Sequence, residues 1–355
     1  MKTKLDIASL VRSNVRELKP YSSARDEFQG NSGNMVFLDA NENPYDNGVN
    51  RYPDPQQKTV KSLLSQIKNV PQSNILLGNG SDEVLDLIYR AFCEPNEDNI
   101  IILPPTYGMY SVLANINAIS LKSVPLDSDF EPNVKAILEA ADERSKIVFI
   151  CSPNNPTANS FSSVKTEQLL ECFQGLVVID EAYIDFSNEK SWLSRLSDFP
   201  NLIVTQTLSK AYGMAGIRLG ICYASEYIIS VLNKIKPPYN VNELTQQRAI
   251  AQLENQSLIQ HQVDMILKER SNLVTALNSI NFVEKIYNSD ANFVLAKVDN
   301  ATKRYDQLIE KGIVVRNRTT QQGCENCLRF TVGTPPENKA LLQALKDLNE
   351  LSFRT

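Results

Sequence analysis

The sequence predicts an α/β protein with a large domain, in which helices cover both faces of a mostly parallel seven-stranded sheet, and a smaller α+β domain. Short apolar runs alternate with amphipathic stretches between residues 75 and 234, which is the pattern of a buried parallel sheet with crossover helices. The pattern changes after Pro237-Pro238. A chain of 355 residues is also long enough to bury one large core and a second, smaller one.

The large domain is expected over residues 45–240. Its strands are predicted from seven apolar runs, at 75–77, 100–103, 120–124, 147–150, 176–179, 202–205 and 219–222. The amphipathic stretches between these runs predict helices at 82–92, 108–115, 133–140, 164–173 and 226–234.

The smaller domain is expected to combine residues 1–44 with residues 241–355. The N-terminal part, with a first helix near 7–12, is assigned to it because it precedes the α/β array. Residues 243–277 predict one long helix, with room for an interruption. Mixed elements follow, with strands at 282–285, 292–297, 313–316 and 327–331 and helices at 302–311 and 337–348.

Composition and charge argue against several classes of protein. The net charge of −5 is unlike that of a nucleic-acid-binding protein, which normally presents a basic face. No apolar run approaches the roughly 20 residues needed to span a bilayer. The N-terminus carries Asp6 early and has no apolar signal core. We therefore expect a cytoplasmic protein that acts on small molecules, with no nucleic-acid or membrane partner.

The histidines and cysteines predict no metal site. His261 is the only histidine, and it lies in a polar helical stretch where a solvated side chain is expected. A Ser-His-Asp hydrolase is therefore disfavoured. Cys324 and Cys327 have CxxC spacing, but no second pair and no nearby histidine complete a metal site. We interpret these cysteines as structural.

Lys210 is the residue with the clearest chemical role. It follows the apolar run 202–205, one residue after Ser209 and eight before Arg218. A lysine at such a strand end can form a Schiff base with pyridoxal phosphate (PLP), while the serine hydroxyl and the arginine guanidinium hold the cofactor's phosphate. The segment therefore predicts a PLP site.

A glycine-rich turn supplies a second candidate for phosphate binding. Gly78-Asn79-Gly80 precedes Ser81 and Asp82, either of which can cap an apolar-periodic helix. The amides and the dipole of such a helix N-terminus suit a phosphate group. An ordinary capped turn is the alternative, because such turns are common. No Gly-Lys-Ser/Thr follows, so the turn is not a nucleotide-binding P-loop.

Two further strand ends carry polar groups. In the segment SPNNPT (152–157), two prolines fix the loop and leave Asn155 where ligands of open α/β sheets bind, although a plain Pro-Asn turn has the same pattern. Asp180 ends the apolar strand 176–179, where a buried carboxylate is costly unless a cation or a donor pairs with it. A protonated pyridine nitrogen is such a partner. Tyr183, three residues on, can donate to the ring's phenolic oxygen.

These segments, in the order GNGSDE, SPNNPT, DEAY and SKAYGMAGIR, resemble those of the fold-type-I PLP-dependent aminotransferases. Within that class the chain is similar to the histidinol-phosphate aminotransferase family, from Val15 to Thr334. The resemblance implies that Lys210 is the Schiff-base lysine and Asp180 the partner of the ring nitrogen. Tyr183 and Asn155 match the donors to the phenolic oxygen. Tyr107 matches the aromatic residue that stacks on the cofactor ring.

The resemblance also implies a phosphate pocket and a homodimer. The residues that match the phosphate pocket are Gly80, Ser81, Asp82, Ser209 and Arg218. Tyr52 matches a tyrosine that reaches this phosphate from the other subunit. The family usually has glycine where this chain has Ala158. A methyl group there is expected to be tolerable if the turn does not need a positive φ.

Substrate binding is assigned by resemblance to two arginines and to the N-terminal segment. Arg329 matches the arginine that holds the substrate carboxylate, and a planar guanidinium can hold a phosphate equally well. Arg316 matches the family's second arginine. Tyr21 and Asn41 match residues of the segment that closes over the substrate's phosphate. Arg318 has no assigned role and is expected at the surface.

The activity implied by the resemblance is ping-pong transamination of L-histidinol phosphate with 2-oxoglutarate, giving imidazole acetol phosphate and L-glutamate in histidine biosynthesis. Lys210, once displaced by the substrate's amine, is expected to act as the base. Two alternatives share the fold, namely an aromatic amino acid aminotransferase and a threonine-phosphate decarboxylase. A remoter alternative is a non-catalytic PLP-fold protein that only binds a ligand.

Overall fold

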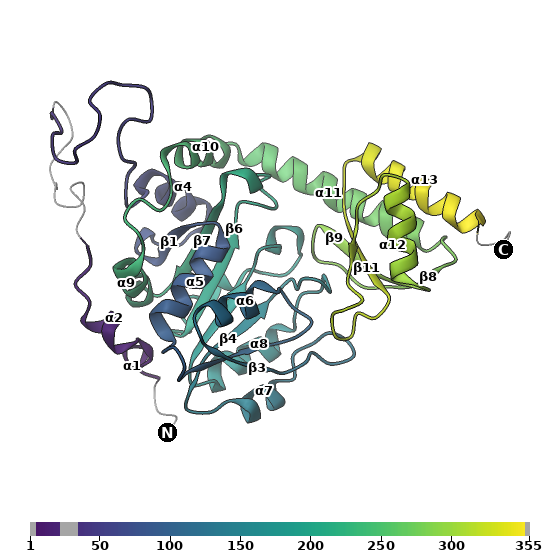
Figure 1. Ribbon diagram of the computed structural model, residues 1–355, viewed down its shortest axis with the longest axis horizontal. Helices are drawn as coiled ribbons and strands as arrows, with labels where there is room; N and C mark the ends of the chain where they lie inside the picture. Colours follow the sequence, from purple (N-terminus) through teal and green to yellow (C-terminus); the bar gives the residue numbers. More distant parts are fainter. Residues whose placement is uncertain (1–4, 22–34, 352–355) are drawn as a thin grey trace.

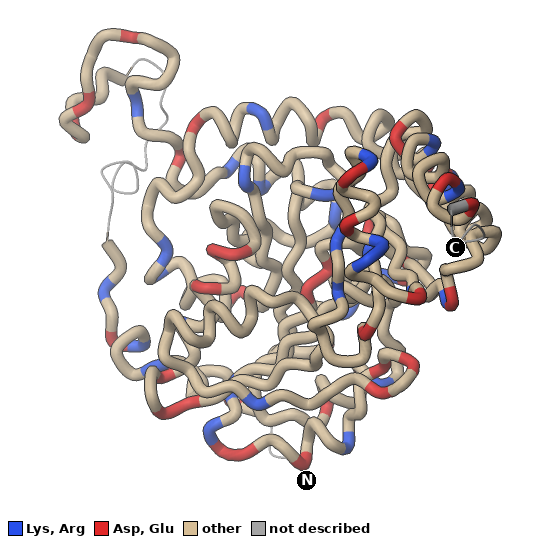
Figure 2. Tube along the Cα trace, turned by 45° about the vertical axis from the view of Figure 1, so that its right-hand side comes forward, with Lys and Arg blue, Asp and Glu red and all other residues tan. Residues whose placement is uncertain are grey.

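The computed structural model describes residues 5–21 and 35–351. They form two sheets, which Figure 1 shows side by side. The large sheet has seven strands in the order β1-β7-β6-β5-β4-β2-β3, and the small one has four strands in the order β10-β11-β9-β8. Figure 2 shows acidic and basic residues interspersed along the chain. Among the described residues, no helix is long and apolar enough to cross a membrane.

All seven predicted strands of the large sheet are confirmed. They pair in parallel except β7, which runs antiparallel to both β1 and β6. The central strands are buried throughout except at Lys146 of β4, which is partly exposed, and this burial explains their apolar runs. The strands are β1 (Ile75–Asn79), β2 (Asn99–Ile102), β3 (Ser120–Ser123), β4 (Ser145–Cys151), β5 (Leu176–Asp180), β6 (Leu202–Thr207) and β7 (Leu219–Ala224).

The five helices predicted between these strands are also confirmed. Three begin at side-chain caps, because Asn133, Ser162 and Ser225 each accept a hydrogen bond from a backbone amide of the first turn. Helix α4 (Lys58–Lys68) was not predicted. The five helices are α5 (Ser81–Phe92), α6 (Met109–Ile116), α7 (Val134–Ala140), α8 (Ser163–Cys172) and α9 (Glu226–Ile235).

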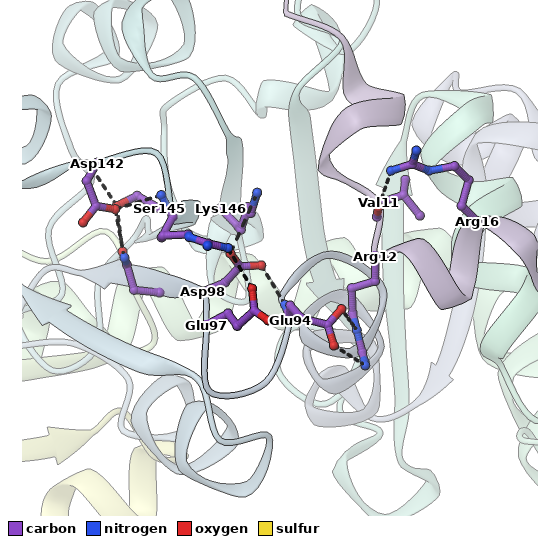
Figure 3. Close-up of polar contacts among 11 residues, drawn as sticks. Val11, Arg12, Arg16, Glu94, Glu97, Asp98, Asp142, Ser145 and Lys146 are labelled. Atoms are coloured by element: carbon purple, nitrogen blue, oxygen red, sulfur yellow. Dashed lines mark hydrogen bonds and ion pairs between the residues drawn. The ribbon is translucent and has the colours of Figure 1, made fainter.

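The N-terminal helices differ from the prediction, which placed them with the small domain. Helices α1 (Ile7–Leu10) and α2 (Ser13–Glu17) pack instead on α5 and α9, where their apolar side chains join a core beneath the large sheet. Figure 3 shows the polar contacts, in which Arg12 reaches Glu94 just after α5. The Arg12 amide also donates to the carbonyl of Ala91 at 3.0 Å. An amphipathic sequence predicts that a short helix buries its apolar face, but it does not say against which domain. The position of α1 and α2 in the sequence therefore did not predict where they pack.

The C-terminal part forms the small sheet and its covering helices. The predicted long helix is interrupted after Leu253, so that α10 and α11 are separate helices. The predicted strand 313–316 is wrong except at its last residue, because the strand found here is β10 (Arg316–Asn317). The remaining predicted elements are confirmed. Besides β10, the elements of this part of the chain are α10 (Glu243–Leu253), α11 (Gln256–Leu277), β8 (Val283–Ile286), β9 (Phe293–Val298), α12 (Ala301–Glu310), β11 (Cys327–Thr331) and α13 (Pro335–Leu351).

Candidate active site

The predicted strand-end motifs meet at one pocket. The pocket lies beyond the carboxyl ends of β4, β5 and β6 and beside the turn from β1 into α5, as expected for an open α/β sheet. Most of the predicted cofactor residues line it. The lining residues are Ser81, Asp82, Tyr107, Cys151, Asn155, Asp180, Ala182, Tyr183, Thr207, Ser209, Lys210, Ala215 and Arg218.

Lys210 lies at the end of β6 with its side chain exposed in this pocket. Its ammonium nitrogen is 5.6 Å from the centre of the Tyr183 ring. Partial removal from water lowers the pKa of Lys210, and the positive charge of Arg329 lowers it further. A lowered pKa increases the fraction of neutral amine, which is the form that can act as a nucleophile or a base.

Asp180 is the buried charge of the site. It ends β5, is 4% exposed, and accepts hydrogen bonds from the Tyr110 hydroxyl at 2.9 Å and the Ala182 amide at 3.2 Å. Burial raises the pKa of Asp180 above its ordinary value. No described lysine or arginine forms an ion pair with it. A buried carboxylate without a countercharge is costly, so the geometry favours a cationic ligand here.

Tyr107 and Tyr110 belong to one aromatic group next to Asp180. Their rings lie edge to face, with centroids 5.6 Å apart. The Tyr107 hydroxyl donates to Asp82 at 3.1 Å, and burial raises the pKa of Tyr107. Tyr110 was not predicted. Its spacing of three residues from Tyr107 places both tyrosines on one side of the chain as it enters α6, which is the signal that was available.

The opposite end of the pocket has the features of an anion site. Gly80 has a positive φ of 82°, and a Cβ atom there would lie 2.7 Å from Nη2 of Arg218. Arg218 is half exposed, and its ion pair with Asp82 is long at 3.7 Å. Ser81 opens α5, so the first amides of that helix face the same region. The Ser209 hydroxyl accepts a hydrogen bond from Thr207 at 3.0 Å.

Arg329 approaches the pocket from the small sheet. Its guanidinium donates to the side-chain oxygen of Asn155 and lies 5.0 Å from the centre of the Phe293 ring. Burial and the nearby charge of Arg318 lower the pKa of Arg329 to about 10. Tyr183 is buried between the two sheets and packs edge to face on Phe293. The two sheets thus meet at the site through Asn155, Tyr183 and Arg329.

Six predicted site residues do not line this pocket. Gly80 directly precedes the lining residue Ser81, and Arg329 contacts the lining residue Asn155, whereas the other four lie elsewhere. Arg316 lies opposite Arg329 on the neighbouring strand, with its side chain exposed. Asn41 and Tyr52 line a different concavity of about 440 Å³, together with residues of α10 and the turn before it. Tyr52 stacks on Tyr239, with ring centroids 4.4 Å apart. Tyr21 is 75% exposed. Their predicted roles stay predictions.

One expectation from the sequence is wrong, and the condition attached to another is not met. Arg318 is half-buried rather than at the surface, and burial lowers its pKa. Ala158 has a φ of 71°, so the turn does need the left-handed region. That conformation costs a non-glycine residue about 1–2 kcal/mol. Ala158 is fully buried in the core on the face of the large sheet opposite to the one covered by α1 and α2, so its methyl group offsets part of this cost, contributing about 0.8 kcal/mol.

His261 is exposed, as expected. Cys324 and Cys327 are buried and free, which agrees with a structural interpretation. Within residues 5–21 and 35–351, no group of three or more histidine, cysteine or acidic side chains could hold a metal ion.

The pocket fits PLP on its own chemistry. Asp180 lacks a countercharge, and a protonated ring nitrogen would supply it. The anion site at Gly80, Ser81 and Arg218 would hold the phosphate group, and Lys210 provides an amine between the two ends.

Fold and pocket together define a fold-type-I PLP-dependent enzyme. The chain belongs to the aminotransferase class I and II family, whose model matches residues 29–345. PLP is therefore its cofactor, and the protein is an aminotransferase.

Two relatives and one solved structure give a more specific comparison. The chain is 65% identical to a histidinol-phosphate aminotransferase of Flavobacterium johnsoniae, over 97% of this chain and 99% of that protein. It is 63% identical to one of Christiangramia forsetii, over 97% and 98% of the two chains. The crystal structure of the histidinol-phosphate aminotransferase from Clostridium acetobutylicum superposes with a TM-score of 0.79 at 26% identity, over 85% of this chain and 91% of that one.

Replacing Arg329 with glutamine is expected to raise the pKa of Lys210, because it removes the largest of the positive charges that act on this amine. In cofactor-free protein, the rate at which trinitrobenzenesulfonate modifies Lys210 should then reach its half-maximum at a higher pH than in wild type. Peptide mass spectrometry measures modification at this lysine alone. Arg316→Gln is the matched control, and an equal displacement in both variants would contradict the assignment.

Proposed function

We propose that this chain transfers the amino group between L-histidinol phosphate and 2-oxoglutarate, yielding imidazole acetol phosphate and L-glutamate in histidine biosynthesis. The observation that carries the proposal is the 65% identity to a histidinol-phosphate aminotransferase over nearly the whole length of both chains. The pocket supports it, since a lysine and a buried aspartate lie beside an arginine from the small sheet.

In this proposal each side chain has a definite task. PLP, when bound, supplies an electron sink for the bonds at the substrate's Cα. The neutral amine of Lys210 would move the proton from the substrate's Cα to C4′ of the cofactor, and in the second half-reaction it would move a proton from C4′ to Cα of the other substrate. Asp180 would keep the ring nitrogen protonated, and Tyr183 and Asn155 would donate to the phenolic oxygen. Tyr107 would hold the ring, and the phosphate would be held by Gly80, Ser81, Asp82, Ser209 and Arg218.

Arg329 binds the anionic group of either substrate in this proposal. A guanidinium presents paired donors that match a carboxylate or a phosphate, so one residue serves both half-reactions. The two substrates then use the same pocket in turn, which is the structural basis of a ping-pong mechanism. Arg316, Tyr21 and Asn41 are assigned to the substrate's phosphate.

The test is an absorbance spectrum of the purified holoenzyme before and after adding L-histidinol phosphate without a keto acid. Loss of the visible cofactor band supports the proposal, because half of a transamination has then occurred. A band that ignores histidinol phosphate but responds to phenylalanine or O-phosphothreonine would assign the chain to one of the alternative activities. A band that responds to no amine would identify a protein that only binds ligands.

We also propose that the active unit is a homodimer in which Tyr52 completes the partner's cofactor pocket. Tyr52 lies outside the Lys210 pocket of its own chain and is half exposed. The segment of residues 35–50, which precedes α4, stands away from the body of the protein in Figure 1. It exposes several apolar side chains, namely Met35, Val36, Leu38, Tyr45 and Val49. Such a segment is better explained by a partner surface than by solvent.

Mixing two impaired homodimers tests this arrangement. A hybrid of a Lys210→Ala subunit and a Tyr52→Ala subunit would contain one pocket with both Lys210 and Tyr52. After subunit exchange at limiting PLP, the mixture should be more active than either parent alone. If Tyr52 served its own chain, every pocket of the hybrid would lack one of the two residues, and mixing would restore nothing.

A further inference from the structure

Three arginines share one face of the small sheet. Arg316 on β10 lies directly opposite Arg329 on β11, and cross-strand partners point to the same face. Arg318 is two residues beyond Arg316, and its amide continues the pairing by donating to the carbonyl of Cys327 at 2.8 Å. Residues two apart on an extended strand point the same way. We call Arg316, Arg318 and Arg329 the arginine cluster.

The cluster has no countercharge in the described part of the chain. None of its members forms an ion pair there, whereas Arg195 and Arg304 each pair with a carboxylate at 2.8 Å and 2.6 Å. Like charges placed opposite one another on a sheet are unfavourable. Burial and the positive charge of Arg316 both lower the pKa of Arg318, which means that they disfavour its charged form.

Arg318 is also short of hydrogen-bond partners. Its Nε atom is fully buried and has none, and the same holds for Nε of Arg329. The buried Thr319 hydroxyl in the adjacent turn is unpartnered as well. Buried donors are normally satisfied in native proteins. Donors left over on two neighbouring guanidinium groups therefore indicate a ligand with several acceptor oxygens.

The cluster lies next to the reaction pocket. Arg329 donates to Asn155, and the charges of Arg329 and Arg318 both act on Tyr183, opposing the effect of burial on its pKa. Asn155 and Tyr183 line the same pocket as Lys210. An anion held by the cluster would therefore belong to the substrate bound in that pocket.

We infer that Arg318 is a third anion-binding arginine, which contacts the doubly charged phosphate of the substrate and selects it over a singly charged carboxylate. The inference rests on the proposed function, since it names the residue that separates the two substrates of one pocket. A phosphate monoester near neutral pH carries close to two charges and three acceptor oxygens. Arg329 alone can satisfy a carboxylate, whereas the phosphate leaves acceptor oxygens for further guanidinium groups, of which Arg318 is one.

The test compares Arg318→Gln with wild type on substrates that differ in the phosphate. The variant should lose about 10- to 100-fold in kcat/KM for L-histidinol phosphate, the effect of a lost hydrogen bond to a charged group. Its kcat/KM for L-histidinol, which has no phosphate, and for L-glutamate should change less than about threefold. An equal loss on all three substrates would mean a structural role and overturn the inference.

Two further variants sharpen the result. Arg318→Lys keeps the charge but not the planar fork, so it should recover part of the loss. Lys346→Gln removes an exposed positive charge from α13 of the same domain, and it should leave the preference for histidinol phosphate unchanged. A similar loss in Lys346→Gln would assign the effect to net charge and overturn the inference.

Failure of the proposed function can be told apart from failure of this inference. If wild-type holoenzyme does not react with histidinol phosphate, the proposed function is wrong. Inorganic phosphate is then used as the probe, as a competitive inhibitor of the reaction with glutamate. An inhibition constant raised about fivefold or more in Arg318→Gln would still support an anion site at Arg318. An unchanged constant would overturn it.

Discussion

Replacing Lys210 with alanine is expected to reduce kcat by about 10³-fold or more, because the variant loses both the amine that bonds to the cofactor and the base at the substrate's Cα. The amine lies in the pocket beside Tyr183, and among the described residues no other lysine lines that pocket. The measurement is the rate of each half-reaction in single turnovers. This separates slow chemistry from slow product release.

Two observations would show that the loss comes from the missing amine. Lys210→Ala should still bind PLP, since Asp180, Tyr107 and Arg218 remain. A small amine such as methylamine should restore part of the rate by acting as a diffusible base. Lys346→Ala, on the exposed surface of α13, is the control and should behave as wild type. Near wild-type turnover in Lys210→Ala would refute the proposed mechanism.

Replacing Asp180 with asparagine is expected to lower kcat by about 10²- to 10³-fold with little change in size or shape. Asparagine keeps an oxygen that can accept from the Ala182 amide, but it has no charge to hold a ring nitrogen protonated. The variant should bind PLP more weakly and react slowly with every amino donor. A loss confined to one donor would contradict the assignment of Asp180 to the cofactor.

Although Asp180→Asn is expected to lower kcat, it should not lower the stability of the cofactor-free protein. Burial raises the pKa of Asp180 in the folded state. Between the ordinary pKa of an aspartate and this raised value, the folded protein binds more protons than the unfolded one, so the free energy of unfolding falls as the pH rises. Asp180→Asn removes that dependence. At neutral pH the cofactor-free variant should therefore be at least as stable as wild type, in urea unfolding followed by circular dichroism.

A stability loss in cofactor-free Asp180→Asn would mean that the carboxylate serves the fold rather than the cofactor. Glu181 is the internal comparison. It is equally buried, but it accepts hydrogen bonds from Ser191, Trp192 and Gln206. Glu181 is unchanged in both proteins, so its own raised pKa cancels in the difference. The two neighbouring buried acids differ in the number of hydrogen bonds that they accept, three for Glu181 and two for Asp180.

The large sheet was predictable because a strand covered on both faces must be apolar along its whole length. This signal matches six of its seven strands, whereas the edge strand β3 was predicted correctly although it is largely exposed. Helix α4 was missed although its sequence, KTVKSLLSQIK, places Val60, Leu63, Leu64 and Ile67 at helical spacing on the core. Strand β10 was predicted too early in the chain, at 313–316. An exposed apolar residue such as Val314 has the same side chain as a buried one.

Tyr110 and Arg318 could not have been assigned from the chain alone. Tyr110 contacts Asp180 across 70 positions of sequence, and its role depends on how α6 packs against β5. Arg318 acquires its burial from the pairing of two strands and from the small sheet's position beside Tyr183. The left-handed turn at Ala158 is a third example, since the residue type favours the ordinary conformation.

The local sequence therefore determined the strands of the large sheet and the functional groups at their ends. Each strand-end motif, such as those at Asn155, Asp180 and Lys210, is recognisable from a few consecutive residues. Parallel strands bring such ends to one edge whatever the intervening chain contains. The docking of the N-terminal helices and the assembly of the arginine cluster were decided by packing between distant segments. The burial of these side chains and the charges that act on them depend on residues that are near in space but distant in the sequence.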